Sequence, residues 1–156
     1  MNRTLTLVGA ALAVALAGPA FAQPAVKFLP GMAAAPISPG AIVPAGSELF
    51  FVSGIPGSAA TGDTAAQTTE VLTKLGAVLK SQGYDYKDVV NAKVYLVGDP
   101  AMGGKMDFMG MNGAFKKVFG TADEPNKPSR VTVQVAGLAA PGSLVEIELV
   151  AAKAAK

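Results

Sequence analysis

The chain has 156 residues, with 13 basic and 11 acidic side chains and a formal net charge of +2. It contains no cysteine and no histidine, which excludes disulfide bonds, thiol nucleophiles and Ser-His catalytic pairs, and removes the commonest general base and metal ligand. The nearly balanced charge also disfavours electrostatic binding to nucleic acid.

The N-terminal segment has the order of a secretory signal peptide. A basic start with Arg3 precedes the apolar run TLTLVGAALAVALAG, and Ala20 and Ala22 form an A-x-A-type cleavage site. A membrane anchor is the alternative, but the run of about 15 residues is shorter than the roughly 20 needed to cross a bilayer. We expect a signal peptide over 1–22, cleavage after Ala22, and a secreted or periplasmic mature chain with no membrane attachment.

The first part of the mature chain predicts strands. Prolines are frequent between 23 and 46, and each removes a backbone donor and disfavours helix in the preceding residue. Short strands are therefore expected at 26–29 and 41–43. The β-prone stretch ELFFVSG follows and predicts a third strand that ends in a turn at Ser53 and Gly54.

The period then changes to that of a helix. Thr64 and Gln67 match a capping box, and Gly83 suits a C-terminal stop. Between them lie apolar side chains at helical spacing, which are Val71, Leu72, Leu75, Val78 and Leu79. The sequence predicts one helix over this segment.

A strand and a second helix follow. The stretch VVNAKVYLV alternates between apolar and polar residues, as a strand does. The second helix is expected over 101–119 with Gly120 as its stop, and its apolar stripe comprises Phe108, Met111, Phe115 and Val118.

Two further strands, RVTVQVAG and SLVEIELVAA, complete the chain. In the last strand Glu146 and Glu148 share the face opposite Val145, Ile147 and Leu149. The order of three strands, a helix, a strand, a helix and two strands predicts an α+β fold, a mixed sheet with two helices on one face. The other face, with valines, leucines and a few polar groups, is typical of a subunit interface. Residues 153–156 are expected to form a flexible tail.

Four polar residues are candidates for a site. After cleavage Arg130 is the single arginine beside eleven lysines, and its planar fork can bind a carboxylate bidentately, which lysine cannot do; a surface ion pair is the alternative. Glu146 either serves a site or is solvated or paired with a lysine. Asn112 is a poor helix former and indicates a specific hydrogen bond, either to a ligand or to a neighbouring loop, whereas Ser53 is a turn residue without a base to activate it.

Taken in order, these segments resemble the RidA family, also called YjgF, whose best-known members are imine deaminases. The resemblance covers about 34–152 and defines a domain over 23–152. It rests on the Ala-Pro start that leads to a strand ending in Ser-Gly, on the first helix with its glycine stop, on MNGAFKKVFG, and on PSRVTVQVAG followed by VEIE.

The resemblance implies a chorismate-mutase-like fold that assembles as a homotrimer around a central barrel, with ligand sites between neighbouring subunits. Arg130 would grip the substrate carboxylate, and Glu146 would handle the attacking water. Ser53, Asn112 and Thr132 would complete the binding site. The implied reaction converts 2-imino or 2-enamino acids into 2-keto acids and ammonia, and needs neither a metal nor an organic cofactor.

Two residues depart from the family pattern. Gly40 stands where many deaminases carry a tyrosine beside the ligand, and Ile55 stands where glutamine is usual. These departures imply a wider, less polar pocket and leave two alternatives open: a non-catalytic protein that binds small carboxylates, and a chaperone-like or nuclease-like trimer.

Overall fold

The computed structural model describes residues 25–154; the expected signal peptide over 1–22 lies outside these residues. Three short 3-10 turns, η1 (Ala59–Thr61), η2 (Tyr86–Asp88) and η3 (Pro100–Met102), lie in the connections. The main elements are β1 (Lys27–Phe28), β2 (Ala41–Ile42), β3 (Glu48–Pro56), α1 (Thr64–Ser81), β4 (Val89–Val97), α2 (Phe108–Lys116), β5 (Ser129–Val135) and β6 (Val145–Lys153).

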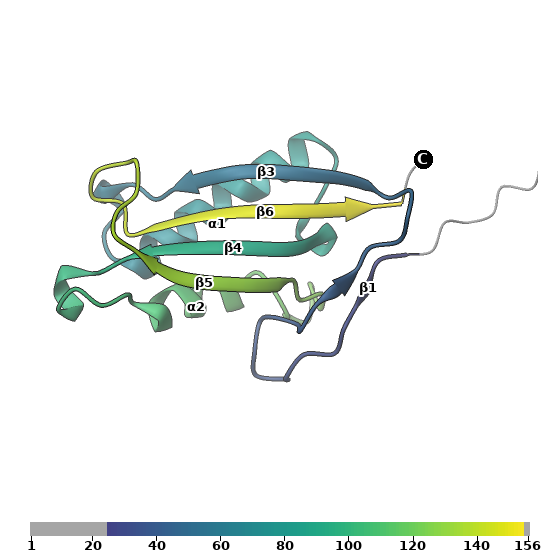
Figure 1. Cartoon of the computed structure of the whole chain (residues 1–156), viewed down its shortest axis with the longest axis horizontal. Coiled ribbons are helices and arrows are strands. Elements are labelled where there is room, and N and C mark those ends of the chain that lie inside the picture. Colours follow the sequence, from purple (N-terminus) through teal and green to yellow (C-terminus); the bar gives the residue numbers. More distant parts are fainter. Residues whose placement is uncertain (1–24, 155–156) are drawn as a thin grey trace, which may run out of the picture.

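The main sheet has the strand order β3-β6-β4-β5. The β4–β5 pair is parallel and the other pairs are antiparallel, so the sheet is mixed. Both helices lie behind one face of this sheet (Figure 1), and the α+β prediction is confirmed. Strands β1 and β2 pair only with each other, and their arm is joined to the start of β5 by a hydrogen bond from Ser38 N to Pro128 O of 3.0 Å.

The core lies between the helices and one face of the sheet. Alternate residues of β4 and β6 point into it, as the sequence pattern predicts, because successive side chains of a strand point to opposite faces. Burying such apolar side chains supplies the main driving force for folding. The fully buried members include Leu72, Leu75, Leu79, Val94, Leu96, Phe115, Ile147 and Leu149.

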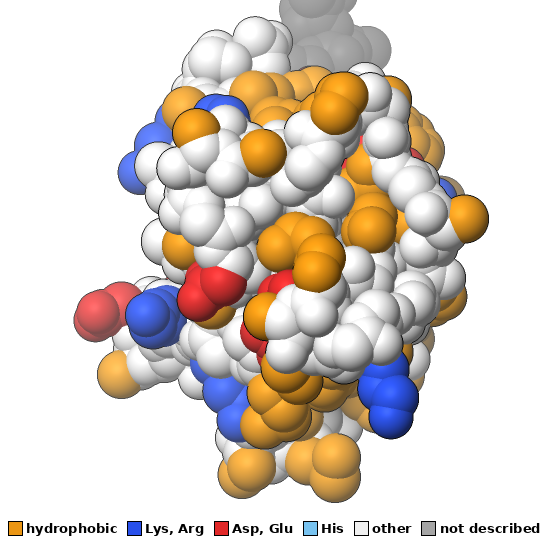
Figure 2. Space-filling view, turned by 90° about the vertical axis from the view of Figure 1, so that its left-hand side faces the viewer, with side chains coloured by type: hydrophobic (Ala, Val, Ile, Leu, Met, Phe, Trp, Pro, Cys, Tyr) orange, Lys and Arg blue, Asp and Glu red, His pale blue; other side chains and the backbone are white. Residues whose placement is uncertain are grey.

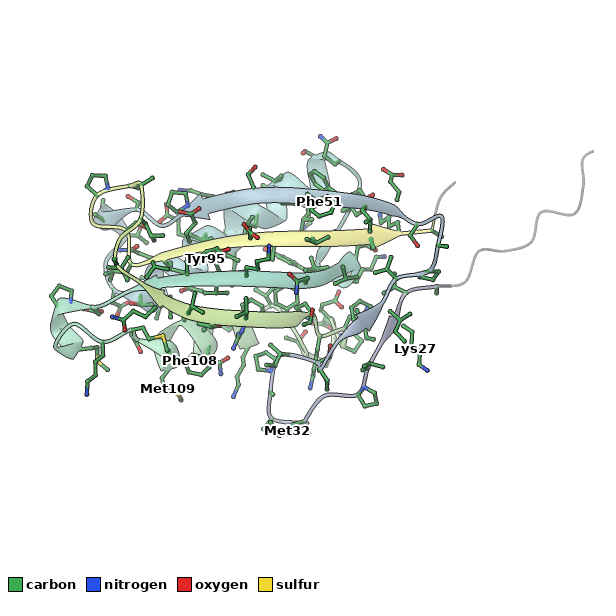
Figure 3. The ribbon with its side chains drawn as sticks, viewed as in Figure 1. Lys27, Met32, Phe51, Tyr95, Phe108 and Met109 are labelled. Carbon is green, nitrogen blue, oxygen red and sulfur yellow. The ribbon has the colours of Figure 1, made fainter. Side chains whose placement is uncertain are left out.

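The opposite face of the sheet is open. Phe51 on β3 is 70% exposed and Val131 on β5 is 47% exposed, and Phe51 and Tyr95 lie on the face turned toward the viewer in Figure 3. Lys93 of β4 forms an ion pair with Glu148 of β6 on this face. Glu148 is thus paired with a lysine of the neighbouring strand.

Strand β3 runs through the expected turn at Ser53 and Gly54. Val52 is in register with Leu149 and Ile55 with Ile147, so two residues of β3 lie opposite one residue of β6. This two-against-one pairing is a β-bulge, which bends a strand without ending it. The prediction that the strand ends at Ser-Gly is wrong, because the bulge absorbs the extra residue and the ladder continues to Pro56.

Helix α1 begins one residue earlier than the predicted capping box implies. Asp63 is the N-cap and its side chain accepts a hydrogen bond from Ala66 N, the usual role of an acidic cap. Gln67 does not reach back to cap the helix; it is buried and its Oε1 accepts from Leu144 N at 2.8 Å. Gly83 adopts a φ of 76° just after the helix, so the predicted stop is confirmed.

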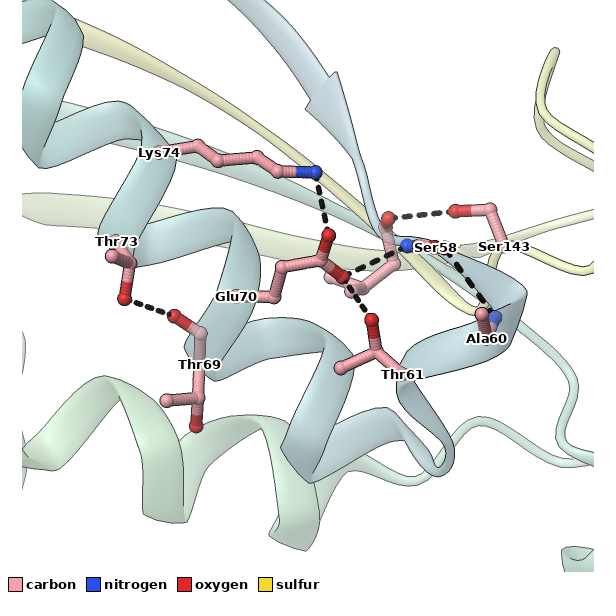
Figure 4. Close-up of polar contacts among 9 residues, drawn as sticks. Ser58, Ala60, Thr61, Thr69, Glu70, Thr73, Lys74 and Ser143 are labelled. Carbon is pink, nitrogen blue, oxygen red and sulfur yellow. Dashed lines mark hydrogen bonds and ion pairs between the residues drawn. The ribbon is translucent and has the colours of Figure 1, made fainter.

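The Glu70 side chain holds the segment between β3 and α1 in place through hydrogen bonds (Figure 4). Its carboxylate accepts hydrogen bonds from Ser58 N and Thr61 Oγ1 and forms an ion pair with Lys74 one turn along the helix. These contacts lower the pKa of Glu70 to about 2. The hydrogen bond from Lys74 has the largest effect, followed by those from Thr61 and Ser58.

The second helix is shorter than predicted. It spans Phe108–Lys116 rather than 101–119, because Gly103 and Gly104 adopt φ values of 65° and 80° that a continuing helix does not allow. Asp107 then caps the new start by accepting from Gly110 N at 2.8 Å. The glycine-rich loop before it is fixed, since Gln134 of β5 donates to Gly104 O and accepts from Met106 N.

The expectation of a flexible tail from position 153 is wrong for Lys153. Lys153 belongs to β6, forms a 3.2 Å ion pair with Asp88 and lies 4.8 Å from the centre of the Tyr84 ring. These contacts explain why the strand continues past Ala152. Within 25–154, no helix combines the length and the apolar character needed to cross a bilayer.

Candidate functional site

Arg130 is held against the inner side of β5 by helix α2. Its Nη2 donates to Asn112 Oδ1 at 2.9 Å, and its Nη1 lies 3.8 Å from the Met111 sulfur. Its guanidinium carbon lies 4.5 Å from the centre of the Phe115 ring and 5.7 Å from that of Phe108, within the range of cation–π attraction. The predicted specific hydrogen bond of Asn112 is therefore made to Arg130.

The sequence places these groups together through two local patterns. Parallel pairing aligns Arg130 with Ala92 of β4, so the arginine points to the helix side of the sheet. On α2, residues 108, 111, 112 and 115 recur at the spacing of one helix face. The sequence pattern predicts Phe108, Met111 and Phe115 as the apolar stripe of α2. Their contact with Arg130 is not predicted by that pattern, although their shared spacing with Asn112 is a signal for it.

The Arg130 guanidinium is half-buried, and burial lowers its pKa to about 10. The side chain therefore remains cationic at neutral pH. No Asp or Glu side chain in the described part of the chain forms an ion pair with it. A partly desolvated guanidinium without a carboxylate partner is unusual, because such charges are normally paired, and it is suited to bind an anion.

Thr132 lies two residues beyond Arg130 on the same side of β5, in register with Val94. Its hydroxyl oxygen is buried and has no hydrogen-bond partner among residues 25–154. The structure thus groups Arg130, Asn112 and Thr132 at the β5 edge of the sheet.

The other two predicted site residues lie elsewhere. Glu146 of β6 is in register with Tyr95 and Pro56, which places its side chain on the open face. Ser53 is exposed and forms the bulge of β3 together with Gly54. The Glu146 carboxylate lies over Gly54, because a Cβ atom built there would be 2.2 Å from Glu146 Oε1.

Arg130 and Glu146 therefore do not meet within one chain. They point to opposite faces of the sheet, and β4 separates their strands. The predicted residues form two groups, one at the β5 edge and one near β3 on the open face. Ile55 packs against the core and borders the same shallow hollow as Ser53.

A groove of about 430 Å³ lies between α1 and α2 and is lined by Leu72, Tyr86, Ala114 and Val118 among others, but by none of the predicted site residues. At the end of the molecule shown in Figure 2, charged side chains of both signs are scattered among hydrophobic ones. Among the described residues no group of three or more acidic side chains is placed to hold a metal ion.

The α+β fold and the positions of Arg130 and Glu146 can now be compared with those of known protein families. A family model described as Endoribonuclease L-PSP matches residues 32–153. The chain belongs to this family, the RidA/YjgF family predicted from its motifs. A RutC family protein from Pyrococcus horikoshii is 35% identical over 116 residues, which cover 71% of this chain and 83% of that protein.

Two further comparisons concern activity and structure. A 2-iminobutanoate/2-iminopropanoate deaminase from Bos taurus is 34% identical over 95 residues, and the matched part covers 61% of each protein. A YjgF family member from Neisseria meningitidis has a TM-score of 0.55 at 29% identity, covering 84% of this chain and 97% of that one. A Rid family protein from Yersinia pestis, with a TM-score of 0.62 at 22% identity, supports the fold alone.

Proposed function

We propose that this chain hydrolyses 2-imino acids, and the 2-enamino acids that tautomerise to them, to 2-keto acids and ammonia. The observation that carries the proposal is Arg130: a half-buried cation, fixed by Asn112 and without an acidic partner among the described residues. Its remaining N–H groups can bind both oxygens of a substrate carboxylate. The similarity to a bovine imine deaminase supports the same reaction.

We propose further that a second copy completes the site. Because Arg130 and Glu146 lie on opposite faces of one sheet, a substrate bound to the Arg130 of one copy can meet only the Glu146 of another. The exposed Phe51 and Val131 on the open face support burial of this face in a closed oligomer. We expect that oligomer to be a homotrimer.

Hydrolysis of the imine requires that the substrate be oriented toward a water molecule and that one side chain carry a proton. Arg130 fixes the carboxylate, so the adjacent imine carbon is held in reach of a water molecule. The water oxygen forms a bond to that carbon while Glu146 accepts its proton. Glu146 then returns the proton to the nitrogen. The carbon–nitrogen bond breaks as the new hydroxyl group forms the keto C=O bond and gives its proton to the departing ammonia, so a 2-keto acid and an ammonium ion leave. An iminium and one water give these two products with atoms and charge balanced.

Gly40 supports a substrate larger than the smallest imino acids. Its segment is bonded to the start of β5 through Ser38. A Cβ at Gly40 would meet only Leu29 Cδ1, at 3.6 Å, and the residue does not adopt a positive φ. Neither backbone conformation nor crowding requires glycine here. If this segment borders the site in the assembly, the absent side chain would leave space for a larger substrate.

The test is an assay in which an amino-acid oxidase generates imino acids in situ. We expect the protein to accelerate loss of the imine and release of ammonia over the rate in buffer, with alanine and leucine as alternative oxidase substrates. The parent chain is compared with Arg130→Ala. Binding of 2-keto acids without any acceleration would instead favour the non-catalytic carboxylate-binding alternative.

A further inference from the structure

We infer that Gly54 is a positioning residue: its missing side chain forms the seat that holds the Glu146 carboxylate where the reaction needs it. The inference rests on the proposed function for its effect on turnover, but the seat itself is a property of the fold. Gly54 would act on the reaction through the position of Glu146.

The seat is built by the bulge of β3. Ser53 and Gly54 together lie opposite Glu148, between the register pairs Val52–Leu149 and Ile55–Ile147. The bulge turns the α-carbon of Gly54 toward Glu146, whose Oε1, Cδ and Cγ would lie 2.2, 3.1 and 3.1 Å from an added Cβ. Oε1 of Glu146 therefore occupies the volume that a Cβ at Gly54 would take, and Cδ and Cγ lie in tight contact with it.

No other local reason requires glycine at this position. Gly54 is not among the glycines with a positive φ, so other residues can adopt its backbone conformation. Glycine is also unfavourable inside a strand, where it often marks a bulge or the close approach of another group. The close approach here is that of the Glu146 carboxylate.

The expected displacement can be derived from these distances. A methyl carbon and an oxygen in ordinary contact are at least 3.4 Å apart, so a Cβ placed 2.2 Å from Oε1 forces the oxygen to retreat by about 1.2 Å. Because the obstructing atoms belong to the end of a flexible, half-exposed side chain, the glutamate can rotate away with little strain on the fold. A shift of about 1 Å at a catalytic group can lower a rate by about a hundredfold.

Gly57, three residues on, offers a contrast. A Cβ there would lie 2.5 Å from Oε1 of Gln67, which is buried and bonded to Leu144 N, Gly62 O and Gly142 O. The Gln67 side chain cannot rotate away from an added Cβ without breaking these hydrogen bonds. Gly57→Ala is therefore expected to lower stability, whereas Gly54→Ala is expected to move Glu146 and leave stability nearly unchanged.

The experiment compares crystal structures, kinetics and thermal unfolding of the parent, Gly54→Ala and Gly137→Ala. An added Cβ at Gly137 meets nothing within 4 Å, so this variant controls for a glycine-to-alanine change. For Gly54→Ala we expect the Glu146 carboxylate to move by about 1 Å or more, kcat to fall tenfold to a hundredfold, KM to change less than threefold, and the unfolding midpoint to stay within a few degrees. Gly137→Ala should match the parent in all four.

A double-variant cycle separates positioning from other roles. In a Glu146→Gln background, Gly54→Ala should cause no further loss of kcat, because residues that act as a unit are not additive. An unmoved carboxylate in Gly54→Ala overturns the seat, and an equal loss in both backgrounds overturns its action through Glu146. If the parent does not hydrolyse imino acids, the proposed function fails, while the position of the carboxylate still tests the seat.

Discussion

Replacing Arg130 tests the carboxylate clamp. Arg130→Lys keeps the positive charge but loses the planar fork and the geometry that bonds Nη2 to Asn112 Oδ1 at 2.9 Å. One charge-assisted hydrogen bond in a partly desolvated site contributes about 1.5–3 kcal/mol, which corresponds to roughly a tenfold to hundredfold loss of affinity. Arg130→Ala also removes the charge and should lose more.

Both variants should remain folded. Arg130 lies at the start of an edge strand, and the buried core is formed mainly by apolar side chains from α1, α2, β4 and β6. The contacts of Arg130 with the Phe108 and Phe115 rings contribute about 0.5–2 kcal/mol. The melting temperature of each variant should therefore fall by several degrees at most, and each variant should still unfold in a cooperative transition.

The assay is calorimetric titration with a 2-keto acid, the proposed product. The control is Lys80→Ala, which removes one positive charge from the exposed face of α1 and should leave binding unchanged. If Arg130→Ala binds the keto acid as tightly as the parent, Arg130 is not the clamp. If that variant unfolds, the arginine has a structural role and the interpretation of its unpaired charge is wrong.

Three other predictions concern the base, the fold and the N-terminus. Glu146→Gln should spare binding of 2-keto acids while lowering kcat at least tenfold; an unchanged kcat in the oxidase-coupled assay would exclude Glu146 as the proton carrier. The pKa of Glu70 is about 2 in the folded state against an ordinary 4.5, so its stabilising effect is present above about 4.5 and is lost as pH falls toward 2. In denaturant unfolding the advantage of the parent over Glu70→Gln should therefore be smaller at pH 3 than at pH 7, and an advantage independent of pH would contradict this assignment. Intact mass of the exported protein should match a chain that begins at Gln23, whereas recovery of full-length chain in membranes would argue against cleavage.

Much of the fold can be predicted from local patterns. The alternation of Val145, Ile147 and Leu149 fixes which row of β6 is buried, because the period of a strand is two. Helical spacing likewise locates α1, and Gly83 marks its end. These features depend on neighbours within a few residues, which is why the sequence alone contains them.

The remaining features depend on contacts between distant segments. The bulge at Gly54 is explained by Glu146, which is more than ninety residues away in the sequence. The truncation of α2 depends on the glycine pair and on Gln134, which fixes the loop. Likewise, no local pattern encodes the strand order that places Arg130 and Glu146 on opposite sides of the sheet.

The central claim is that one site draws Arg130 from one copy and Glu146 from another. Co-expression of Arg130→Ala with Glu146→Gln, each strongly impaired alone, tests it directly in mixed oligomers isolated by two different tags, with a trimer of roughly 40 kDa expected for the assembly. Each mixed trimer, whatever its composition, has one interface of three at which a native Arg130 meets a native Glu146, so the isolated mixed trimers should restore about a third of the parent's sites. Imine hydrolysis near that fraction is the predicted result. Mixed oligomers that remain as inactive as either variant alone would contradict the shared site.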